Sequence, residues 1–322
     1  MSTLAVSSKE KLRFILKSTH TKIIKEISRN SGFSGVGIAR AGFMDEEAKR
    51  LEYWLNQGVY GEMDYMARHF DLRTDPTQLV PGAKSVISLL YNYFPKEDQA
   101  VKDSPRISKY AWGKDYHKVI RKKLQEFFTQ IQLRIGNVSG RVFVDSAPVL
   151  EREWAVRSGL GWMGKNTLLI TPKQGSFFFL AEIICDLELD EDPPIKDYCG
   201  TCRKCIIACP TGAIKPEGYH LETNQCISYL TIEHRSAIPY EFKSKMEDYI
   251  FGCDICQDVC PWNRFSKPHN EKAFIPENEL MNMTKSEWIE LTQEVFHQLF
   301  KDSAIKRTKF SGLKRNIGFL YE

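Results

Sequence analysis

Cysteine spacing is the feature of this sequence that points most directly to chemistry. Eight of the nine cysteines lie between Cys199 and Cys260, in two runs that each end in Cys-Pro. The runs are Cys199-x2-Cys202-x2-Cys205-x3-Cys209-Pro210 and Cys253-x2-Cys256-x3-Cys260-Pro261. Three thiolates at the first spacing can surround three corners of a 4Fe–4S cubane, while the fourth cysteine ligates another cluster. Structural zinc also uses paired C-x2-C units, but it requires neither the three-cysteine run nor the x3 spacing.

The eight clustered cysteines are enough for two sites with four ligands each. The second run lacks a first cysteine, and Cys226 stands alone upstream to supply it. We therefore expect one 4Fe–4S cluster on Cys199, Cys202, Cys205 and Cys260, and another on Cys209, Cys226, Cys253 and Cys256. Cys185 lies in an apolar run and is expected to be a small buried hydrophobe. Adjacent clusters of this kind pass single electrons, so the long segment before them is predicted to house an electron acceptor.

Asp145 is the most informative carboxylate, because it directly follows the apolar run of residues 141–144. One interpretation is structural: Asp145 or Ser146 caps a helix that Pro148 opens. The other is a general acid, whose pKa would be raised by burial against Phe143 and Val144 so that it holds a proton near neutral pH. The spacing alone does not separate the two.

Residues 159–167 nearly match the phosphate-binding pattern G-x4-G-K-[ST], but Asn166 replaces the hydroxyl residue. A helix pattern precedes these glycines and a strand pattern follows, the reverse of a P-loop, so we reject nucleotide binding. The glycines suit close backbone approach to a flat ligand, or serve only the geometry of a turn. Residues 108–117, rich in aromatic and hydrogen-bonding groups, suit a loop that contacts a base or cofactor, or one packed on the core.

Charge is concentrated at the end of the chain. Residues 301–322 hold six bases and two acids, and the rest of the 322-residue chain carries bases and acids in equal number. This end can contact a phosphate backbone, or form a solvated helix. No apolar run reaches the length of a membrane span, and the N-terminus lacks a signal-peptide core. We therefore expect a cytoplasmic protein.

Hydrophobic periodicity predicts an alternation of helices and strands. Helices are expected over residues 9–30, 45–57, 116–135, 149–158 and 285–301. Strands are expected over residues 36–39, 85–93, 141–144, 167–170 and 177–184. This pattern indicates an α/β arrangement in layers. We expect a first domain over residues 1–190, a cysteine-rich domain over 191–265 and a helical, basic segment over 266–322.

Several of these segments together resemble one family, the epoxyqueuosine reductases, which are cobalamin-dependent enzymes of queuosine synthesis in tRNA. The matching stretches are GEMDYM at residues 61–66 with Arg68, PGAKSV at 81–86, YAWGKDYH at 110–117, VDSAPVLER at 144–152, GWMGKN at 161–166, and both cysteine runs through Asn263. The likeness spans residues 30–320. The combination is specific to the family, whereas the cysteine runs alone are not.

The resemblance implies a fold and a site. The fold is an α/β (α+β) N-terminal cobalamin-binding domain, nitroreductase- and reductive-dehalogenase-like, with a ferredoxin-like two-cluster 4Fe–4S domain and a short helical C-terminus. By motif match, Asp145 falls on the family's proton donor and also on a cobalamin contact. Further cobalamin contacts are implied at Arg68, Ser108, Tyr110, Lys165, Leu168, Leu169 and Gln225.

The implied reaction reduces epoxyqueuosine to queuosine at the wobble position of tRNA. Electrons would pass from the clusters to cobalamin, either with attack of reduced cobalt on the epoxide carbon or by direct transfer without a carbon–cobalt bond. The implied partners are tRNA and an unidentified electron donor, with no membrane, and we expect a monomer. Longer family members carry a C-terminal helical-repeat extension, so residues 306–315 are expected to contact tRNA unaided.

Two other functions fit part of the pattern. A corrinoid reductive dehalogenase would share the cofactors, but such enzymes usually carry an export signal, which this sequence lacks. A two-cluster electron-transfer subunit, whose first domain only docks a partner, would contain iron and sulfide without a corrinoid.

Overall fold

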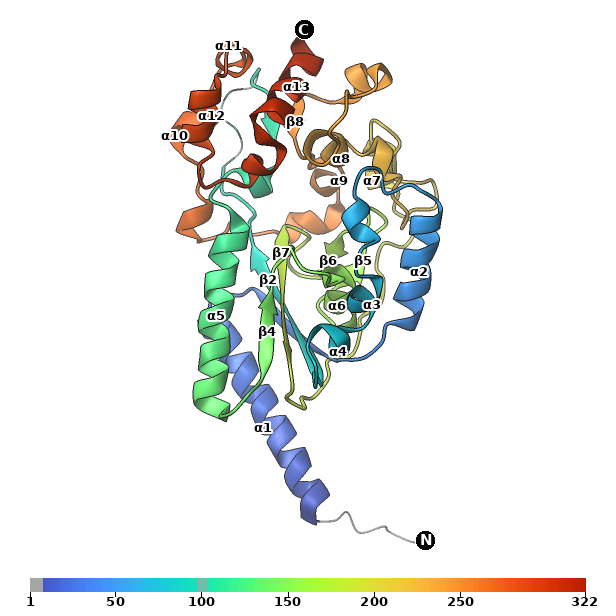
Figure 1. The fold of residues 1–322 in the computed structure, drawn as a ribbon, viewed down its shortest axis with the longest axis vertical. Helices are drawn as coiled ribbons and strands as arrows, with labels where there is room; N and C mark the ends of the chain where they lie inside the picture. Colours follow the sequence, from blue (N-terminus) through green and yellow to red (C-terminus); the bar gives the residue numbers. More distant parts are fainter. Residues whose placement is uncertain (1–7, 98, 100, 102) are drawn as a thin grey trace.

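Four antiparallel strands form the central sheet of the computed structural model, which describes residues 8–97, 99, 101 and 103–322. Their order is β1-β2-β7-β4 (Figure 1), with β1 at Gly35–Arg40, β2 at Ser85–Asn92, β7 at Phe178–Cys185 and β4 at Gly140–Phe143. Strand β7 is interior to the sheet, and its Glu182 pairs with Ser88 of β2 on one side and Phe143 of β4 on the other. The sequence-based strand assignments are confirmed at all four positions.

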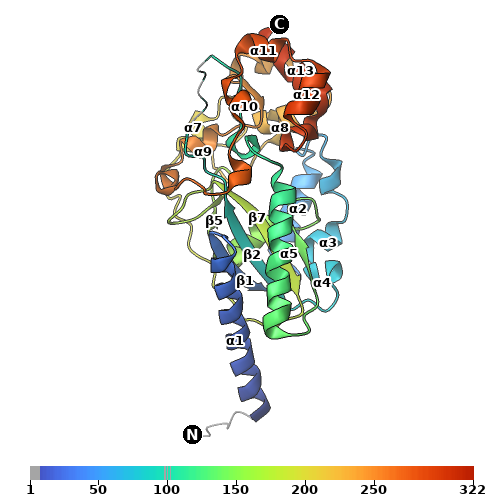
Figure 2. The ribbon, with the colours of Figure 1, turned by 90° about the vertical axis from the view of Figure 1, so that its left-hand side faces the viewer.

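Helices cover both faces of the sheet. On one face α1 (Ser8–Asn30) and α5 (Tyr116–Ile135) lie side by side, as Figure 2 shows. On the other lie α2 (Asp45–Asn56), α3 (Phe70–Thr74), α4 (Pro76–Leu79) and α6 (Glu151–Arg157). Helix α5 begins where the Asp115 carboxylate accepts the backbone N–H of His117, a cap that satisfies an unpaired donor of the first turn. This cap helps to fix the direction in which the side chains of Tyr116 and His117 point from the first turn of α5.

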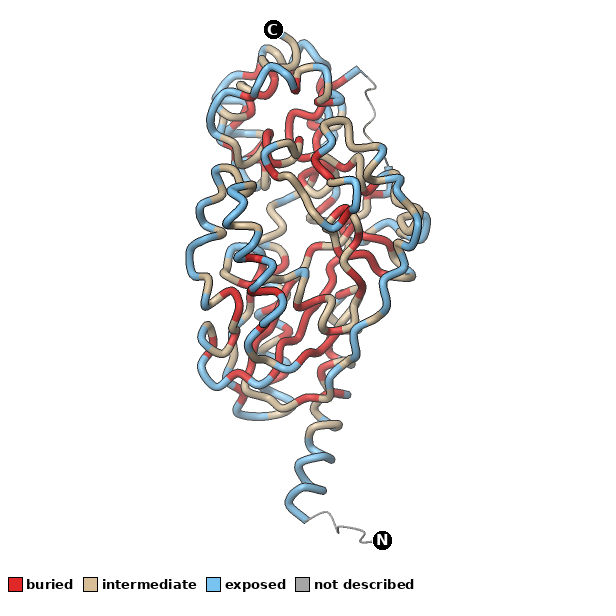
Figure 3. The backbone as a smooth tube through the Cα atoms, turned by 90° about the vertical axis from the view of Figure 1, so that its right-hand side faces the viewer, coloured by how far each residue is buried: buried red, intermediate tan, exposed pale blue. Residues whose placement is uncertain are grey.

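Helix α1 packs over only part of its length. Its later turns bury Ile24 and Ile27 in the core, whereas Phe14, Ile15 and Leu16 of the earlier turns are exposed. Figure 3 shows these exposed turns projecting below the body of the molecule. The helix is confirmed, but the apolar side chains of its first turns are not buried. Among the described residues, no helix is long and apolar enough to cross a membrane.

A short hairpin carries the glycine-rich segment. It consists of β5 (Trp162–Met163) and β6 (Leu169–Ile170). A Cβ at Gly161 would lie 2.3 Å from the carbonyl oxygen of Ile170, and one at Gly164 would lie 2.5 Å from the Ile170 side chain. Glycine is needed here because the hairpin's own chain fills the space, so the turn-geometry interpretation accounts for these two positions.

The cysteine-rich segment is built from short elements. They are α7 (Lys204–Ala208), α8 (Ile227–Ile232), α9 (Ile255–Asp258), β8 (Tyr249–Phe251) and the 3-10 helices η3 (Thr223–Gln225), η4 (Tyr240–Lys245) and η5 (Pro261–Phe265). Strand β3 (Arg106–Ile107) comes from the first part of the chain and pairs in parallel with β8. The loop that follows β3 is thereby held against the cysteine-rich segment.

The C-terminal segment is helical but not as predicted. The expected helix over residues 285–301 is wrong: Thr284 and Thr292 each cap a new helix, which gives α11 (Lys285–Ile289) and α12 (Gln293–Leu299). The other elements of the first and last parts are α10 (Asn278–Asn282), α13 (Lys309–Tyr321), η1 (Asp64–Met66), η2 (Lys109–Ala111), η6 (Lys272–Phe274) and η7 (Ala304–Thr308). A buried cluster joins Trp288 and Phe296 to Ile107 and Phe251. The C-terminal helices therefore share a core with the β3–β8 pair, and the domain boundaries at residues 190 and 265 stay a prediction.

Candidate active site

Asp145 lies immediately after β4, in a loop at the edge of the sheet. Its φ of 54° is in the left-handed region that a non-glycine residue rarely adopts. One carboxylate oxygen, Oδ2, accepts hydrogen bonds from the Tyr116 hydroxyl at 2.7 Å and from His117 Nε2 at 2.8 Å. Helix α6 begins at Glu151 after Leu150, without a side-chain cap. The interpretation of Asp145 or Ser146 as a helix cap is therefore wrong.

His117 bridges two carboxylates. Its Nδ1 lies 2.7 Å from Asp115 and its Nε2 lies 2.8 Å from Asp145. Burial alone would lower the pKa of His117, but hydrogen bonds to Asp115 and Asp145 outweigh it and raise that pKa to about 9. At neutral pH the ring is an imidazolium that donates from both nitrogens.

The charge of Asp145 follows from these partners. Burial would raise its pKa, but hydrogen bonds from His117 and Tyr116, with the charges of His117 and Arg307, lower it below its ordinary value. The expectation of a raised pKa at Asp145 is therefore wrong. In this arrangement the proton resides on His117, one hydrogen bond away from the carboxylate.

Arg307 reaches this site from the basic end of the chain. Its guanidinium forms two hydrogen bonds of 3.1 Å with Glu233 and lies 5.9 Å from the centre of the Tyr65 ring. Burial, followed by the charge of Glu233, raises the pKa of Tyr65 to about 12. Sequence reasoning placed Arg307 only at a phosphate backbone, because no local pattern links residue 307 to residues 65 and 145.

Two further carboxyl groups lie beneath Asp145, and sequence reasoning missed both. Glu151 accepts a hydrogen bond from the backbone N–H of Asp145. Glu182, from the interior strand β7, is fully buried. Burial, and then the neighbouring Asp145 charge, raises the pKa of Glu151 to about 8, and burial with the Glu151 charge raises the pKa of Glu182 well above its usual range. The apolar run of β7 could have marked Glu182 as buried, but nothing in the sequence places Glu151 next to it.

The first predicted set of cysteines converges. Cys199, Cys202, Cys205 and Cys260 line one small pocket together with Lys165 and Trp262. Burial, followed by the charges of the other three cysteines, raises the pKa of Cys205 to about 11. The indole Nε1 of Trp162 lies 3.4 Å from the sulfur of Cys199 and donates toward it. All cysteines in the described residues are free thiols.

The second predicted set converges beside the first. Burial, and then the charges of Cys253, Cys226, Cys209 and Cys205 in that order, raises the pKa of Cys256. Three of these neighbours belong to the second predicted set, whereas Cys205 belongs to the first. The two sets are therefore neighbours in space, and helices α7 and α9, which carry Cys205 and Cys256, contact each other.

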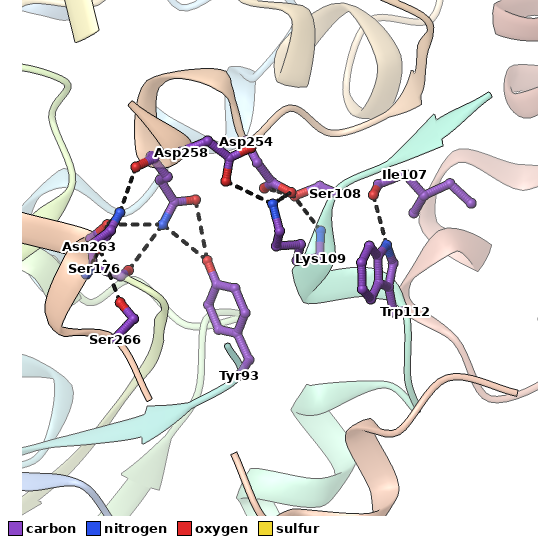
Figure 4. A network of polar contacts seen from close by, with 11 residues as sticks. Tyr93, Ile107, Ser108, Lys109, Trp112, Ser176, Asp254, Asp258, Asn263 and Ser266 are labelled. Atoms are coloured by element: carbon purple, nitrogen blue, oxygen red, sulfur yellow. Dashed lines mark hydrogen bonds and ion pairs between the residues drawn. The ribbon is translucent and has the colours of Figure 1, made fainter. Parts of the chain in front are cut away.

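The loop after β3 is anchored to the cysteine-rich segment. The Ser108 hydroxyl donates to the buried Asp254 at 2.5 Å, and the backbone N–H of Lys109 donates to the same carboxylate at 2.8 Å (Figure 4). The Lys109 ammonium lies 2.7 Å from Asp258. A cavity of about 850 Å³ adjoins this network, with Lys109 and Cys260 in its wall. Tyr110, the next predicted contact, packs edge-to-face against Tyr116, the residue that donates to Asp145.

The remaining predicted cofactor contacts fall in different places. Lys165 donates to the backbone carbonyls of Gly200 at 2.6 Å and Cys202 at 3.0 Å, and so holds the cysteine loop. Leu168 and Leu169 lie in the β5–β6 hairpin, and Gln225 ends η3 directly before Cys226. Arg68 is exposed in the loop after η1. Their roles as cobalamin contacts stay predictions.

Comparisons with known proteins show which family the chain belongs to. Residues 73–146 match the family model "Epoxyqueuosine reductase QueG, DUF1730", and residues 198–263 match the model of the 4Fe-4S double cluster binding domain. An epoxyqueuosine reductase from Leadbetterella byssophila is 57% identical over 304 residues, which cover 94% of this chain and 99% of that protein.

Solved structures share the fold. A crystal structure of epoxyqueuosine reductase with an epoxyqueuosine-modified tRNA-Tyr stem loop superposes with a TM-score of 0.83 at 29% identity, covering 95% of this chain and 81% of the other. A catabolic reductive dehalogenase superposes at 0.50 with 17% identity, covering 95% of this chain and 38% of its own, which is a likeness of fold alone. Fold and cluster-domain match together define an iron–sulfur oxidoreductase. The chain belongs to the epoxyqueuosine reductase family.

Proposed function

We propose that this protein reduces epoxyqueuosine to queuosine in tRNA, using cobalamin that receives electrons from two 4Fe–4S clusters. The observation that carries the proposal is the placement of Asp145, with its His117 and Tyr116 partners, in the same molecule as two neighbouring sets of four thiols. The match to relatives that bear this activity over nearly the whole chain supports it.

The residues present fit both kinds of cofactor. Eight free thiols in two sets provide four ligands for each cluster, which is the number a cubane requires. Beside Tyr116 and His117, 54% of the Asp145 side chain remains exposed to meet a ligand. Bound cobalamin would supply the two-electron chemistry at the epoxide.

The chain's own groups supply protons. Conversion of an epoxide to an alkene consumes two electrons and two protons and releases one water molecule. Because Asp145 is a carboxylate at rest, the proton comes from the His117 imidazolium at 2.8 Å, and Asp145 is placed to take it up and pass it to the epoxide oxygen. Asp115, on the other ring nitrogen, holds the imidazole in the orientation this transfer needs.

The proposal also covers the contact with tRNA, the electron donor, the oligomeric state and the cellular compartment. Lys306 and Lys309 are exposed at the C-terminal end and suit contact with the phosphate backbone. We further propose that the protein acts as a monomer in the cytoplasm, where its tRNA substrate resides and thiol ligands stay reduced. A separate one-electron donor would supply the clusters.

Anaerobic reconstitution tests the function. Protein loaded with iron, sulfide and cobalamin is incubated with epoxyqueuosine-bearing tRNA and a low-potential reductant, and the nucleosides are then analysed. We expect loss of epoxyqueuosine with matching gain of queuosine. Loaded protein that leaves the epoxide intact, or that dehalogenates a bromophenol instead, would reject the proposal.

A further inference from the structure

The backbone of Asp145 has an unfavourable conformation, and one side chain contacts it at the N–H. Its left-handed φ of 54° costs free energy for a residue with a Cβ, so other contacts must stabilise it. The backbone N–H of Asp145 donates to the Glu151 carboxyl, which projects from the first turn of α6. Glu151 thus ties the backbone of the Asp145 loop to α6, while Tyr116 and His117 hold the Asp145 side chain from α5.

Glu182 lies behind Glu151 in the interior of the sheet. It is fully buried, and within the described residues no donor is paired with either of its carboxyl oxygens. Helix α6, which begins at Glu151, contacts β7, which carries Glu182, and the carboxyl groups of the two glutamates interact. Two neighbouring carboxylates repel each other, and an unpaired charge on the fully buried Glu182 is costly. One proton between the two carboxyl groups removes both penalties, because it supplies the missing donor and cancels one charge.

We infer that Glu151 and Glu182 share a proton, and that this protonated pair is a positioning device that holds the backbone of Asp145 in place. The inference rests on the proposed function in one respect, since Asp145 is the proton donor there. The chemistry of the pair resembles that of two carboxyl groups that cannot both ionise at close range. Neither glutamate touches the substrate in this role.

Ionisation of the pair should release the loop. The charged or titratable groups that act on Glu151 from the surrounding elements are Asp145 after β4, Tyr116 on α5, Arg152 on α6 and Glu182 on β7. Only Arg152 is a cation, and its guanidinium is engaged by the Thr167 carbonyl. When the shared proton leaves, two negative charges beneath the Asp145 carboxylate repel one another, and Glu151 can no longer stay at the Asp145 N–H.

Hydrogen exchange tests this without turnover. Exchange of the peptide covering residues 143–150 is followed from pH 6 to pH 10, corrected for the intrinsic pH dependence of exchange. In the wild-type protein we expect protection of the Asp145 amide to fall about tenfold as the pH rises through the range in which Glu151 and Glu182 lose their shared proton. Glu182→Gln and the double variant Glu151→Gln/Glu182→Gln keep an acceptor and a neutral partner, so their protection should stay constant with pH.

Truncation and a control complete the test. Glu151→Ala removes the acceptor and should lose protection at every pH, whereas Glu151→Gln should restore it. Glu153→Gln, on the same helix and paired with Arg50 at the surface, should behave as the wild type. Wild-type protection in Glu151→Ala, or a pH-dependent loss that persists in Glu182→Gln, would overturn the inference. Because exchange needs no substrate, this failure is separable from failure of the proposed activity.

Discussion

His117 Nε2 lies 2.8 Å from Asp145 Oδ2, and this contact decides where the proton sits. With the pKa of His117 raised to about 9 and that of Asp145 lowered, the pair is an imidazolium and a carboxylate at neutral pH. The carboxylate can take up the proton of the imidazolium and pass it to a bound substrate. The site therefore keeps a proton at hand without requiring an acid of elevated pKa.

Replacing Asp145 should remove most of the turnover. Asp145→Asn keeps the size of the side chain but cannot carry a proton to the epoxide oxygen, so we expect a loss of about 10²–10⁴-fold in kcat. Cobalamin and iron content, measured by absorbance and metal analysis, should equal those of the wild type. Full turnover by Asp145→Asn would remove its role as the acid.

Replacing His117 should have an effect that depends on pH. His117→Gln retains a hydrogen bond to Asp145 but holds no charge, so turnover at pH 7 should fall about tenfold or more. The raised pKa means that wild-type His117 is charged below about pH 9 and neutral above it. The ratio of wild-type to variant kcat should therefore shrink as the pH rises through 9. A ratio that stays constant from pH 7 to pH 10 would show that the charge on His117 is not used.

Glu182 should make the protein less stable at high pH. Its pKa is raised on folding, so its contribution to stability is complete below the unfolded value near 4.3 and is lost as the pH rises toward the folded value. Glu182→Gln has no proton to lose. Against the wild type, its gain in unfolding free energy should be near zero at pH 5 and about 1–3 kcal/mol at pH 9. Denaturant unfolding at both pH values measures this, and a difference that does not change with pH contradicts the buried-acid assignment.

Replacing a cysteine of one set should remove one cluster and leave the other in place. Cys205→Ser removes a ligand of the first predicted cluster and Cys256→Ser removes one of the second, so each variant should lose about half of the iron of a two-cluster protein. Cys185→Ser is the matched control, because this buried thiol lies in β7 and belongs to neither set. Iron and sulfide analysis after anaerobic reconstitution reads the result. Equal iron in Cys205→Ser and the wild type would exclude Cys205 as a ligand.

The elements that are predictable from sequence are those with a strong local period. Strands β2 and β7 have long apolar runs, and α5 has both an Asp115 cap and a regular apolar face. Helices α11 and α12 are merged in the prediction because the apolar period continues across Thr292, and the capping interaction there is visible only in three dimensions. The exposed first turns of α1 are misjudged because period alone does not show how far a neighbouring element extends.

The candidate site also has one part that the sequence predicts and another that it does not. Cysteine spacing encodes ligand geometry within a few residues, so both sets can be proposed from sequence alone. The surroundings of Asp145 come from four separate elements: Tyr116 and His117 on α5, Glu151 on α6, Glu182 on β7 and Arg307 on η7. The apolar neighbours of Asp145 along the chain predict the wrong direction for its pKa, because the hydrogen-bond donors come from α5.

The basic end does not act as one surface, and this changes the test of tRNA binding. Arg307 is paired with Glu233, and Arg315 donates to the carbonyl of Leu230 in α8 and to those of His234 and Ser236, which follow α8 in the chain. Reversing their charge would disturb the site or the fold before it revealed any contact with tRNA. Lys306 and Lys309 are exposed and suit a test of the phosphate contact.

Charge reversal at these two lysines should weaken tRNA binding. For Lys306→Glu/Lys309→Glu, the slope of log K against log salt should fall by about one for each phosphate that the protein no longer neutralises. The matched control is Lys9→Glu/Lys22→Glu, which makes the same change of charge at exposed positions on α1, the helix that begins at the opposite end of the molecule (Figure 1). Binding is measured by fluorescence anisotropy with a labelled anticodon stem-loop at several salt concentrations. If both double variants weaken binding equally, the effect is one of net charge, and the C-terminal lysines make no specific contact.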